Sequence, residues 1–406
     1  MTLFEIDELS QVEKVMLPDS SSTPASVLAA AALSQLCEPG DTFMGKLFEH
    51  LGSEKLLNAL VARLEAGQME NVLGRQFVAE LEEEYRTLFI VLWNNAMDRW
   101  LQRLSKTEVI DAVLQLAELG GKLLSWQCDD YPRNLHDLQA GRPPALWLLG
   151  NPELLADLPR ISVVGTRSSN RYGTTAAADL AAVAVQNRIV TVSGGALGID
   201  SVIHHSTLVL EGDTIAILAG GLANLYPRSN LDLLKRISRS GLLLAEQPPA
   251  VRVSKWRFLM RNRLIAALGD ATVVVQAGRT SGALSTAKHA VSIARPVAVV
   301  PGPIDSAFSV GCHDFLNEHL GEVQLLARPQ ALPDLVKMPA LGTADTAGLG
   351  NLEKRALDTF TDKPMEAWEV QRLAGLTVKE TQIALGSLQL SGHIERAGTR
   401  YVSCWK

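Results

Sequence analysis

Between residues 161 and 300 the chain alternates short apolar runs with longer amphipathic stretches. Each run ends at a Gly, Pro or Ser turn, and the runs cover residues 161–164, 189–193, 214–218, 242–245, 271–275 and 297–300. Continuous apolar runs of this length are typical of strands that are buried on both faces, and the intervening stretches are long enough for helical crossovers. The pattern therefore predicts an α/β fold with a doubly wound, Rossmann-like parallel sheet.

The segment before this region has the periodicity of helices. An all-α N-terminal domain is expected over residues 24–128, with helices at 25–35, 43–51, 53–64, 72–98 and 107–119. The polar segment 1–23 predicts a disordered leader. The sheet domain is expected over 129–327, an extended Rossmann-like domain that includes an edge strand at 145–149.

The C-terminal segment predicts a separate small domain. Residues 328–351 are rich in Pro, Gly, Ala and Thr, a composition that is typical of a linker. Three short helical patterns and one alternating pair follow, at residues 352–361, 366–374, 378–391, 394–396 and 400–402. Three helices and a hairpin predict a winged-helix domain over 352–406.

Charge is distributed unevenly along the 406 residues, whose net charge is −6. Residues 1–150 carry a net −10, residues 151–330 a net +4, and the remainder is neutral. Three stretches contain no acidic residue at all: 158–178, 247–269 and 271–304. Because the local sign of charge governs attraction to a polyanion, the middle region remains a candidate for binding nucleic acid.

Composition narrows the class of protein further. The four cysteines lie far apart in the sequence, so neither a metal site nor a disulfide framework is expected. No signal peptide and no membrane-spanning stretch is visible, and we expect a cytoplasmic protein.

Two glycine turns follow the first two predicted strands of the sheet. Gly165, Thr166 and Arg167 end the first strand. Ser193, Gly194 and Gly195 end the second. Glycine lets a backbone approach a ligand closely, and a guanidinium group can bind a phosphate through two hydrogen bonds. For one such turn alone, tight turning between strand and helix is the better explanation, but two at the same edge of a sheet favour a phosphate-binding surface.

A cationic and aromatic segment, RVSKWRFLMRNR, spans residues 252–263. Five of its twelve residues are basic, and its candidate contacts are Lys255, Phe258, Arg261, Asn262 and Arg263. Cations hold phosphates while aromatic rings stack on unpaired bases, a combination that suits single strands better than a duplex. The competing interpretation is an amphipathic helix whose aromatic residues lie in the core.

A third turn, with Ser281 and Gly282, follows the strand expected at 271–275 and begins another helix. The chain contains neither a GxxxxGK[ST] nor a GxGxxG motif, so hydrolysis of nucleoside triphosphates and dinucleotide redox chemistry are poorly supported. His204 and His205 are interpreted as structural, because no carboxylate or cysteine motif accompanies them.

Taken in order, these motifs resemble one family. VVGTR, VSGGALGID, Tyr226-Pro227 with Asn230, RNRLIAAL, SGALSTA and VPGP are similar in sequence and spacing to the DNA-processing protein A (DprA/Smf) family, most closely over residues 130–325. The resemblance implies binding of single-stranded DNA, a homodimer, loading of a RecA-type recombinase during natural transformation and no catalytic activity or cofactor. Single-strand-binding protein is a further expected partner.

The family's DNA contacts are carried over to Arg167, Lys255, Phe258, Arg261 and Arg263. The chain departs from the family pattern at Leu197, where many members have a cation, and at Leu259, where a proline is usual. The leucine at 259 predicts a more helical segment before RNR.

The alternative function is a nucleotide-binding sensor or a phosphoribohydrolase of the lysine-decarboxylase-like Rossmann group. Those enzymes carry a PGGxGTxxE stretch whose glutamate takes part in the chemistry. The corresponding segment here, AGRTSGALSTAKHA, contains no carboxylate, and the sequence therefore favours a DNA-binding protein that is not an enzyme.

Overall fold

The structure is a computed structural model that describes residues 6–17, 22–74, 83–337, 351–360, 364–390, 394–397 and 400–403. It divides into two compact units, residues 1–341 and residues 342–406. Among the described residues, no helix is both long enough and apolar enough to cross a membrane.

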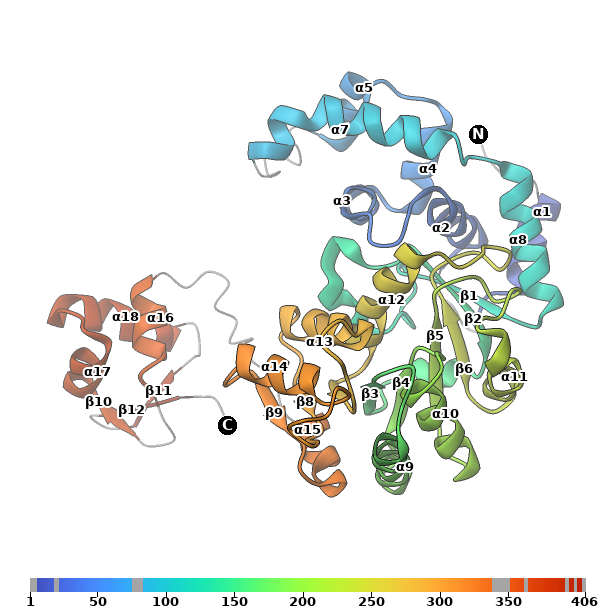
Figure 1. Ribbon diagram of the computed structural model, residues 1–406. Coiled ribbons are helices and arrows are strands. Elements are labelled where there is room, and N and C mark those ends of the chain that lie inside the picture. Colours follow the sequence, from blue (N-terminus) through green and yellow to red (C-terminus); the bar gives the residue numbers. More distant parts are fainter. Residues whose placement is uncertain are drawn as a thin grey trace. The chain divides into compact units, whose positions relative to one another are not determined.

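The described part of the first unit contains a nine-stranded sheet (Figure 1). Its strands are β1 (Lys122–Ser125), β2 (Ala145–Gly150), β3 (Arg160–Val164), β4 (Val190–Ser193), β5 (Thr214–Leu218), β6 (Leu242–Ala245), β7 (Ala271–Val274), β8 (Val297–Val299) and β9 (Val323–Leu325). They lie in the order β1-β2-β6-β5-β4-β3-β7-β8-β9. From β6 to β9 all neighbours are parallel, whereas β2 pairs antiparallel with both β1 and β6.

Strand β3 is where the chain order of the sheet reverses. It pairs with β4 on one side and with β7 on the other, with Val164 opposite Val274. Open α/β sheets bind ligands in the crevice at such a switch point, outside the carboxyl ends of the strands. The fold therefore directs attention to the residues that follow Val164 and Val274.

Alternation along β3 determines which helices cover each face of the sheet. Ile161 and Val163 belong to one core cluster with residues of α9 (Arg171–Gln186) and α10 (Ile199–Val209). Ser162 points to the other face, where its hydroxyl donates a 2.6 Å hydrogen bond to the Ile265 carbonyl of α12 (Lys255–Leu268). Successive side chains of a strand point to opposite faces, so the predicted sheet, buried on both faces, is confirmed.

The remaining α-helices of this region follow strands β5, β7, β8 and β9 in turn. They are α11 (Leu231–Ser240), α13 (Gly282–Ser292), α14 (Val310–Glu318) and α15 (Leu332–Lys337). The first lies between β5 and β6, and the second between β7 and β8.

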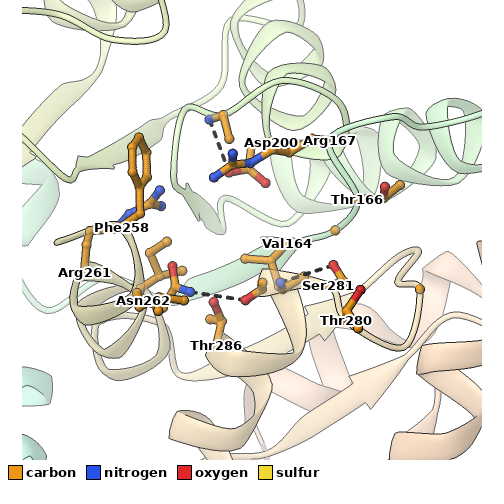
Figure 2. Close-up of a pocket in the computed structure, with 17 residues that line it drawn as sticks. Val164, Thr166, Arg167, Asp200, Phe258, Arg261, Asn262, Thr280, Ser281 and Thr286 are labelled. Carbon is orange, nitrogen blue, oxygen red and sulfur yellow. Dashed lines mark hydrogen bonds between the residues drawn. The ribbon is translucent and has the colours of Figure 1, made fainter. Parts of the chain in front are cut away.

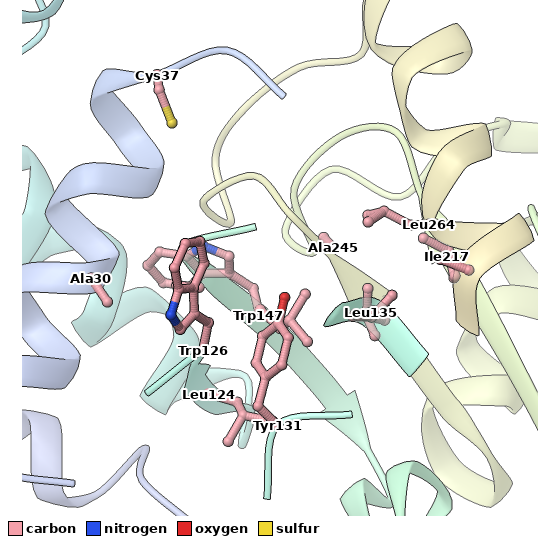
Figure 3. Packing of buried hydrophobic residues seen from close by; sticks show 14 of the residues in the cluster. Ala30, Cys37, Leu124, Trp126, Tyr131, Leu135, Trp147, Ile217, Ala245 and Leu264 are labelled. Atoms are coloured by element: carbon pink, nitrogen blue, oxygen red, sulfur yellow. The ribbon is translucent and has the colours of Figure 1, made fainter. Parts of the chain in front are cut away.

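The N-terminal helices include one that packs directly on β1 and β2 of this sheet. They are α1 (Ile6–Glu13), α2 (Pro24–Leu36), α3 (Thr42–Leu51), α4 (Ser53–Val61), α5 (Ala66–Leu73), α7 (Glu83–Leu101) and α8 (Lys106–Glu118). Figure 3 shows Ala30 of α2 and Cys37, the residue that follows this helix, on one side of Trp126 and Trp147, in the same buried cluster as Leu264. Helix α2 and the sheet therefore share one hydrophobic core.

The structure differs from the sequence-based expectation at the margins of the sheet. Strand β2, expected at an edge of the sheet, is internal because β1 pairs with its outer side. Strand β9 at the opposite edge was not expected. Since β1 begins at Lys122, the sheet starts before the boundary expected at residue 129. Short strands such as KLLS and VQL carry too few residues to be distinguished from loops by periodicity.

Two segments that were expected to be unstructured contain helices. Within the predicted leader, α1 packs against α2 and α8, Val12 and Val15 are fully buried, and Leu123 donates a 2.8 Å backbone hydrogen bond to Val15. Within the predicted linker, α15 packs Leu332 and Leu335 against α9, and residues 338–350 lie outside the described part. Tertiary packing stabilises both helices. The overall composition of each segment did not predict them, because only a few apolar residues in each make the packing contacts.

The second unit contains the three predicted helices and the hairpin. Its elements are α16 (Asn351–Leu357), β10 (Met365–Glu366), α17 (Ala367–Ala374), α18 (Val378–Leu390), β11 (Ile394–Ala397) and β12 (Arg400–Ser403). The strands pair antiparallel in the order β10-β12-β11 over a core that includes Val370 and Leu385. Its assignment as a winged helix remains a prediction.

Candidate nucleic-acid interface

A pocket of about 540 Å³ opens at the switch point of the sheet. Figure 2 shows side chains converging on it from the turn after β3, the beginning of α10, the helix α12 and the beginning of α13. Its lining includes Gly165, Thr166, Arg167, Ala196, Asp200, Phe258, Leu259, Arg261, Asn262, Thr280, Ser281, Gly282 and Thr286. Gly165 and Thr286, 121 positions apart in the chain, therefore meet at one edge of the sheet.

Backbone contacts hold the turn after β3 in place. The Thr166 N–H donates to the carbonyl of Gln276, after β7, at 2.7 Å, and the Ile199 N–H donates to the Thr166 carbonyl at 3.2 Å. Gly198 makes this possible, because a Cβ there would lie 2.2 Å from the Thr166 oxygen, and its φ is +78°. The exposed side chain of Arg167 is thus presented from a fixed backbone.

Phe258 lies between two arginines at the mouth of the pocket. The guanidinium carbon of Arg167 lies 5.3 Å from the centre of its ring, and that of Arg261 lies 6.0 Å away. The ring of Tyr226, which is 48% exposed, meets Phe258 edge-on at 5.8 Å. An aromatic ring can stack on a base, and a guanidinium group beside it can donate hydrogen bonds to the phosphate of the same nucleotide.

Arg261 is the buried cation of the pocket, with only 6% of its surface exposed. Burial lowers the pKa of its guanidinium to about 10, the nearby charge of Asp200 acts against this shift, and Arg167 adds to it. The group therefore stays charged at neutral pH. Its Nε has no hydrogen-bond partner among the described residues, which leaves donor capacity unused.

Asp200, in the first turn of α10, organises the second glycine turn. Its carboxylate accepts hydrogen bonds from the N–H groups of Gly194 and Ala196, at 3.2 and 3.3 Å. Burial raises the pKa of this carboxyl group, while Arg261 and the two N–H groups act in the opposite direction. One carboxylate thus faces two arginines, and the pocket keeps an excess of positive charge.

The second glycine turn is built differently from the prediction. The Gly194 N–H, expected to contact phosphate, is engaged by Asp200, and Ser193 is fully buried with its hydroxyl donating to the Val163 carbonyl at 2.7 Å. Gly195 does not line the pocket. The structural reason for Gly194 is space: a Cβ there would lie 1.5 Å from Nη1 of Arg261.

The basic residues of α12 divide into an exposed and a buried set. Lys255 is exposed at the first residue of the helix, which Ser254 caps by accepting the Arg257 N–H at 3.2 Å. Arg263 is 5% exposed, lies outside the pocket lining and pairs with buried Glu246. This geometry gives Arg263 a structural ion pair in place of the phosphate contact expected from the sequence.

The far wall of the pocket is formed by the beginning of α13. Ser281 caps this helix by accepting the Ala283 N–H at 3.3 Å, so its oxygen is already a hydrogen-bond acceptor. The Asn262 amide nitrogen donates to the Gly282 carbonyl at 3.2 Å, which orients the amide of Asn262 beside the pocket. Because the N-terminus of a helix carries partial positive charge, the beginning of α13 favours an anion here.

Both departures from the family pattern are visible in this region. Leu259 is 48% exposed and lines the pocket, and α12 runs as one helix from Lys255 through the RNR motif, as the leucine predicts. Leu197 is 42% exposed.

His204 is buried, and its Nδ1 lies 2.7 Å from the Thr214 hydroxyl. Burial, followed by the charge of Arg261, lowers the pKa of this imidazole to about 3.

Sequence reasoning missed three contributors to this site. Tyr226 was noted only as part of a motif, and nothing in its sequence neighbourhood pairs it with Phe258. Asp200 entered only as the last residue of the VSGGALGID motif and Thr286 only as part of SGALSTA, yet both line the pocket. Only the fold brings these residues together.

Comparison with known proteins decides the family. The family model described as DNA recombination-mediator protein A matches residues 122–330. A Mycobacterium tuberculosis protein described as DNA processing protein DprA is 38% identical over 283 residues, which cover 67% of this chain and 71% of the relative. The chain belongs to the DNA recombination-mediator protein A family.

Further relatives agree with this assignment. The DNA processing protein DprA of Bacillus subtilis is 38% identical over 170 residues, or 42% of this chain and 57% of the relative. The X-ray structure of DNA processing protein A from Streptococcus pneumoniae covers 75% of this chain and 95% of its own, with 27% identity and a TM-score of 0.58. Membership supports a role in DNA processing as a recombination mediator.

Proposed function

We propose that this protein binds single-stranded DNA in the pocket at the switch point and presents it to a RecA-type recombinase during natural transformation, without catalysing a reaction and without a cofactor. The observation that carries the proposal is the arrangement of Arg167, Phe258 and Arg261. A stacking ring flanked by two cations, only one of which is exposed, suits a strand whose bases are unpaired.

The contacts have separate tasks in this proposal. Arg167 and Lys255 hold phosphates from the exposed rim, and Arg261 supplies positive charge from below, where low dielectric strengthens it. Phe258 stacks on a base, and the beginning of α13 supplies backbone donors through Gly282. A duplex offers neither free base faces nor a strand narrow enough for this pocket.

Two protomers would bind one DNA strand more tightly than a single protomer does. If the protein is a homodimer, two pockets engage one strand, and the second binding event benefits from a high effective concentration. The recombinase and single-strand-binding protein are proposed as partners from the family resemblance.

The enzyme alternative would depend on the one carboxylate of the pocket lining, Asp200. Its oxygen accepts two backbone N–H groups, so it holds the glycine turn and is poorly placed to act as a base. We therefore propose that purified protein releases no phosphate from ATP and no base from nucleoside monophosphates. Turnover that is lost in Asp200→Asn would favour the enzyme.

The direct test is binding of labelled single-stranded and duplex oligonucleotides, followed by strand exchange on DNA that is coated with single-strand-binding protein. We expect single strands to bind at least about tenfold more tightly than duplex. The wild type should shorten the lag before the recombinase acts, and Arg167→Ala/Lys255→Ala should not. Equal affinity for both forms of DNA would contradict the DNA proposal, whereas an unchanged lag with intact binding would contradict only the mediator role.

A further inference from the structure

Helix α11 presents three cations and one acid on its solvent face. Asp232, Lys235, Arg236 and Arg239 are spaced at i, i+3, i+4 and i+7, which places them on one side of the helix. All four are exposed, while Leu234 and Ile237 are buried on the opposite side.

Asp232 offsets only one of the three cations on this face. Arg236 has one close partner, the imidazole of His205 at 3.3 Å, and Lys235 and Arg239 form no ion pair with any residue that the structure describes. Residues 228–239 contain four basic residues against one acidic residue, in a chain whose net charge is −6. Exposed cations are normally interspersed with acids on a helix face, so this excess favours a polyanionic ligand.

The basic face begins beside the mouth of the pocket. Tyr226, which contacts Phe258, is followed two residues later by exposed Arg228, in the turn that opens α11. From there the ten residues of α11 extend for about 15 Å. A stacked strand advances about 3.4 Å per nucleotide, so this length faces roughly four nucleotides.

We propose that the basic face of α11, formed by Lys235, Arg236 and Arg239, is a second phosphate-contact surface for the strand that enters the pocket. The inference rests on the proposed function. Because no aromatic ring accompanies these cations on the helix, the contact is electrostatic and independent of base sequence. Short strands fill only the pocket, and longer strands gain affinity by reaching α11.

The test compares full-length wild type with Lys235→Gln/Arg236→Gln/Arg239→Gln, using fluorescent single strands of about 6 and about 20 nucleotides. We expect the variant to bind the short strand within twofold of wild type. It should bind the long strand about tenfold more weakly, with the slope of log affinity against log salt reduced by about 2, since each phosphate contact on a single strand contributes about 0.7.

A matched control removes the same charge elsewhere. Lys55, Arg133 and Arg328 are also exposed and lie outside α11 and the pocket lining, and their triple glutamine variant should bind both strands as wild type does. Equal losses in both triple variants would mean that only net charge matters, and would overturn the proposal.

Two further outcomes are separable. Unchanged long-strand affinity in the α11 variant, with loss of recombinase loading, would assign the face to an acidic protein surface and overturn the DNA contact. Failure of wild type to bind single strands of either length would instead contradict the proposed function itself.

Discussion

Gly194 makes room for Arg261. A Cβ at residue 194 would lie 1.5 Å from Nη1 and 2.4 Å from the central carbon of the Arg261 guanidinium group. The glycine that was expected to contact phosphate therefore leaves space for the buried cation that lines the pocket. The Gly194 N–H donates a hydrogen bond to the Asp200 carboxylate. Gly194 therefore contacts both the acid and the arginine of the pocket.

We first predict that Gly194→Ala displaces Arg261. Overpacking of this kind costs about 1–3 kcal/mol of folding stability, and loss of the positioned charge should weaken single-strand binding about tenfold or more. Thermal unfolding and a binding titration measure the two effects. Gly67→Ala is the control, because nothing lies within 4 Å of its added Cβ and alanine suits the helix it occupies. Wild-type affinity in a folded Gly194→Ala protein would show that Arg261 does not contribute.

The second prediction separates stacking from charge. Phe258→Ala should weaken single-strand binding by about 1–3 kcal/mol without changing the salt slope, because no cation is lost. Arg167→Ala should weaken binding and reduce the slope by about 0.7. Trp368→Ala removes an aromatic ring that is 56% exposed in the other unit and should change neither quantity. A reduced slope in Phe258→Ala would mean that the ring mainly positions the two arginines.

The third prediction concerns Glu38, which lies between α2 and α3 and binds Arg257 of α12. Its carboxylate accepts two hydrogen bonds from Arg257, at 3.0 and 3.2 Å, and pairs with Arg103 at 2.8 Å. We expect Glu38→Gln to lower folding stability by at most about 1 kcal/mol, because the pair is partly exposed to solvent, and to weaken DNA binding through the position of α12.

The pH dependence of this variant has a defined sign. Burial tends to raise the pKa of Glu38, but the hydrogen bonds and charges of Arg257 and Arg103 outweigh it and lower the pKa below its ordinary value of 4.5. Its stabilisation is therefore present above pH 4.5 and is lost as pH falls through the lowered pKa. Unfolding temperatures of wild type and Glu38→Gln should converge in acid. The control is Glu54→Gln, because the Glu54 carboxylate accepts a 3.2 Å hydrogen bond from the Thr23 hydroxyl.

The fourth prediction concerns the C-terminal unit. The exposed residues of α18 include Val378, Lys379, Gln382 and Ile383, with a single cation among them. A helix that lies in a major groove normally carries several cations, so we expect this unit to contact protein and not DNA. Truncation after Gly348 should leave single-strand affinity within about threefold, less than 1 kcal/mol. A large loss of affinity in a truncated protein that remains folded would contradict this expectation.

The sequence by itself determined the parallel sheet, since runs such as 214–218 and 242–245 are apolar throughout and could be buried only between two layers of helices. It also determined which loops gather at one edge, because the carboxyl ends of parallel strands lie together. Gly165, Arg167 and Gly282, which follow β3 and β7 in the chain, accordingly line one pocket.

Only the tertiary structure decided the role of each residue at the carboxyl edge of the sheet. Arg261 and Arg263 are two positions apart in one motif, yet one points under the pocket and the other pairs with Glu246, since helical geometry turns residues at i and i+2 to different faces. The partners that fix these tasks, Asp200, Gly194 and Glu246, come from other elements, and local sequence patterns contain no information about contacts between distant segments. Burial and partner charge, which depend on those contacts, distinguish a cation that can meet DNA from one that holds the fold.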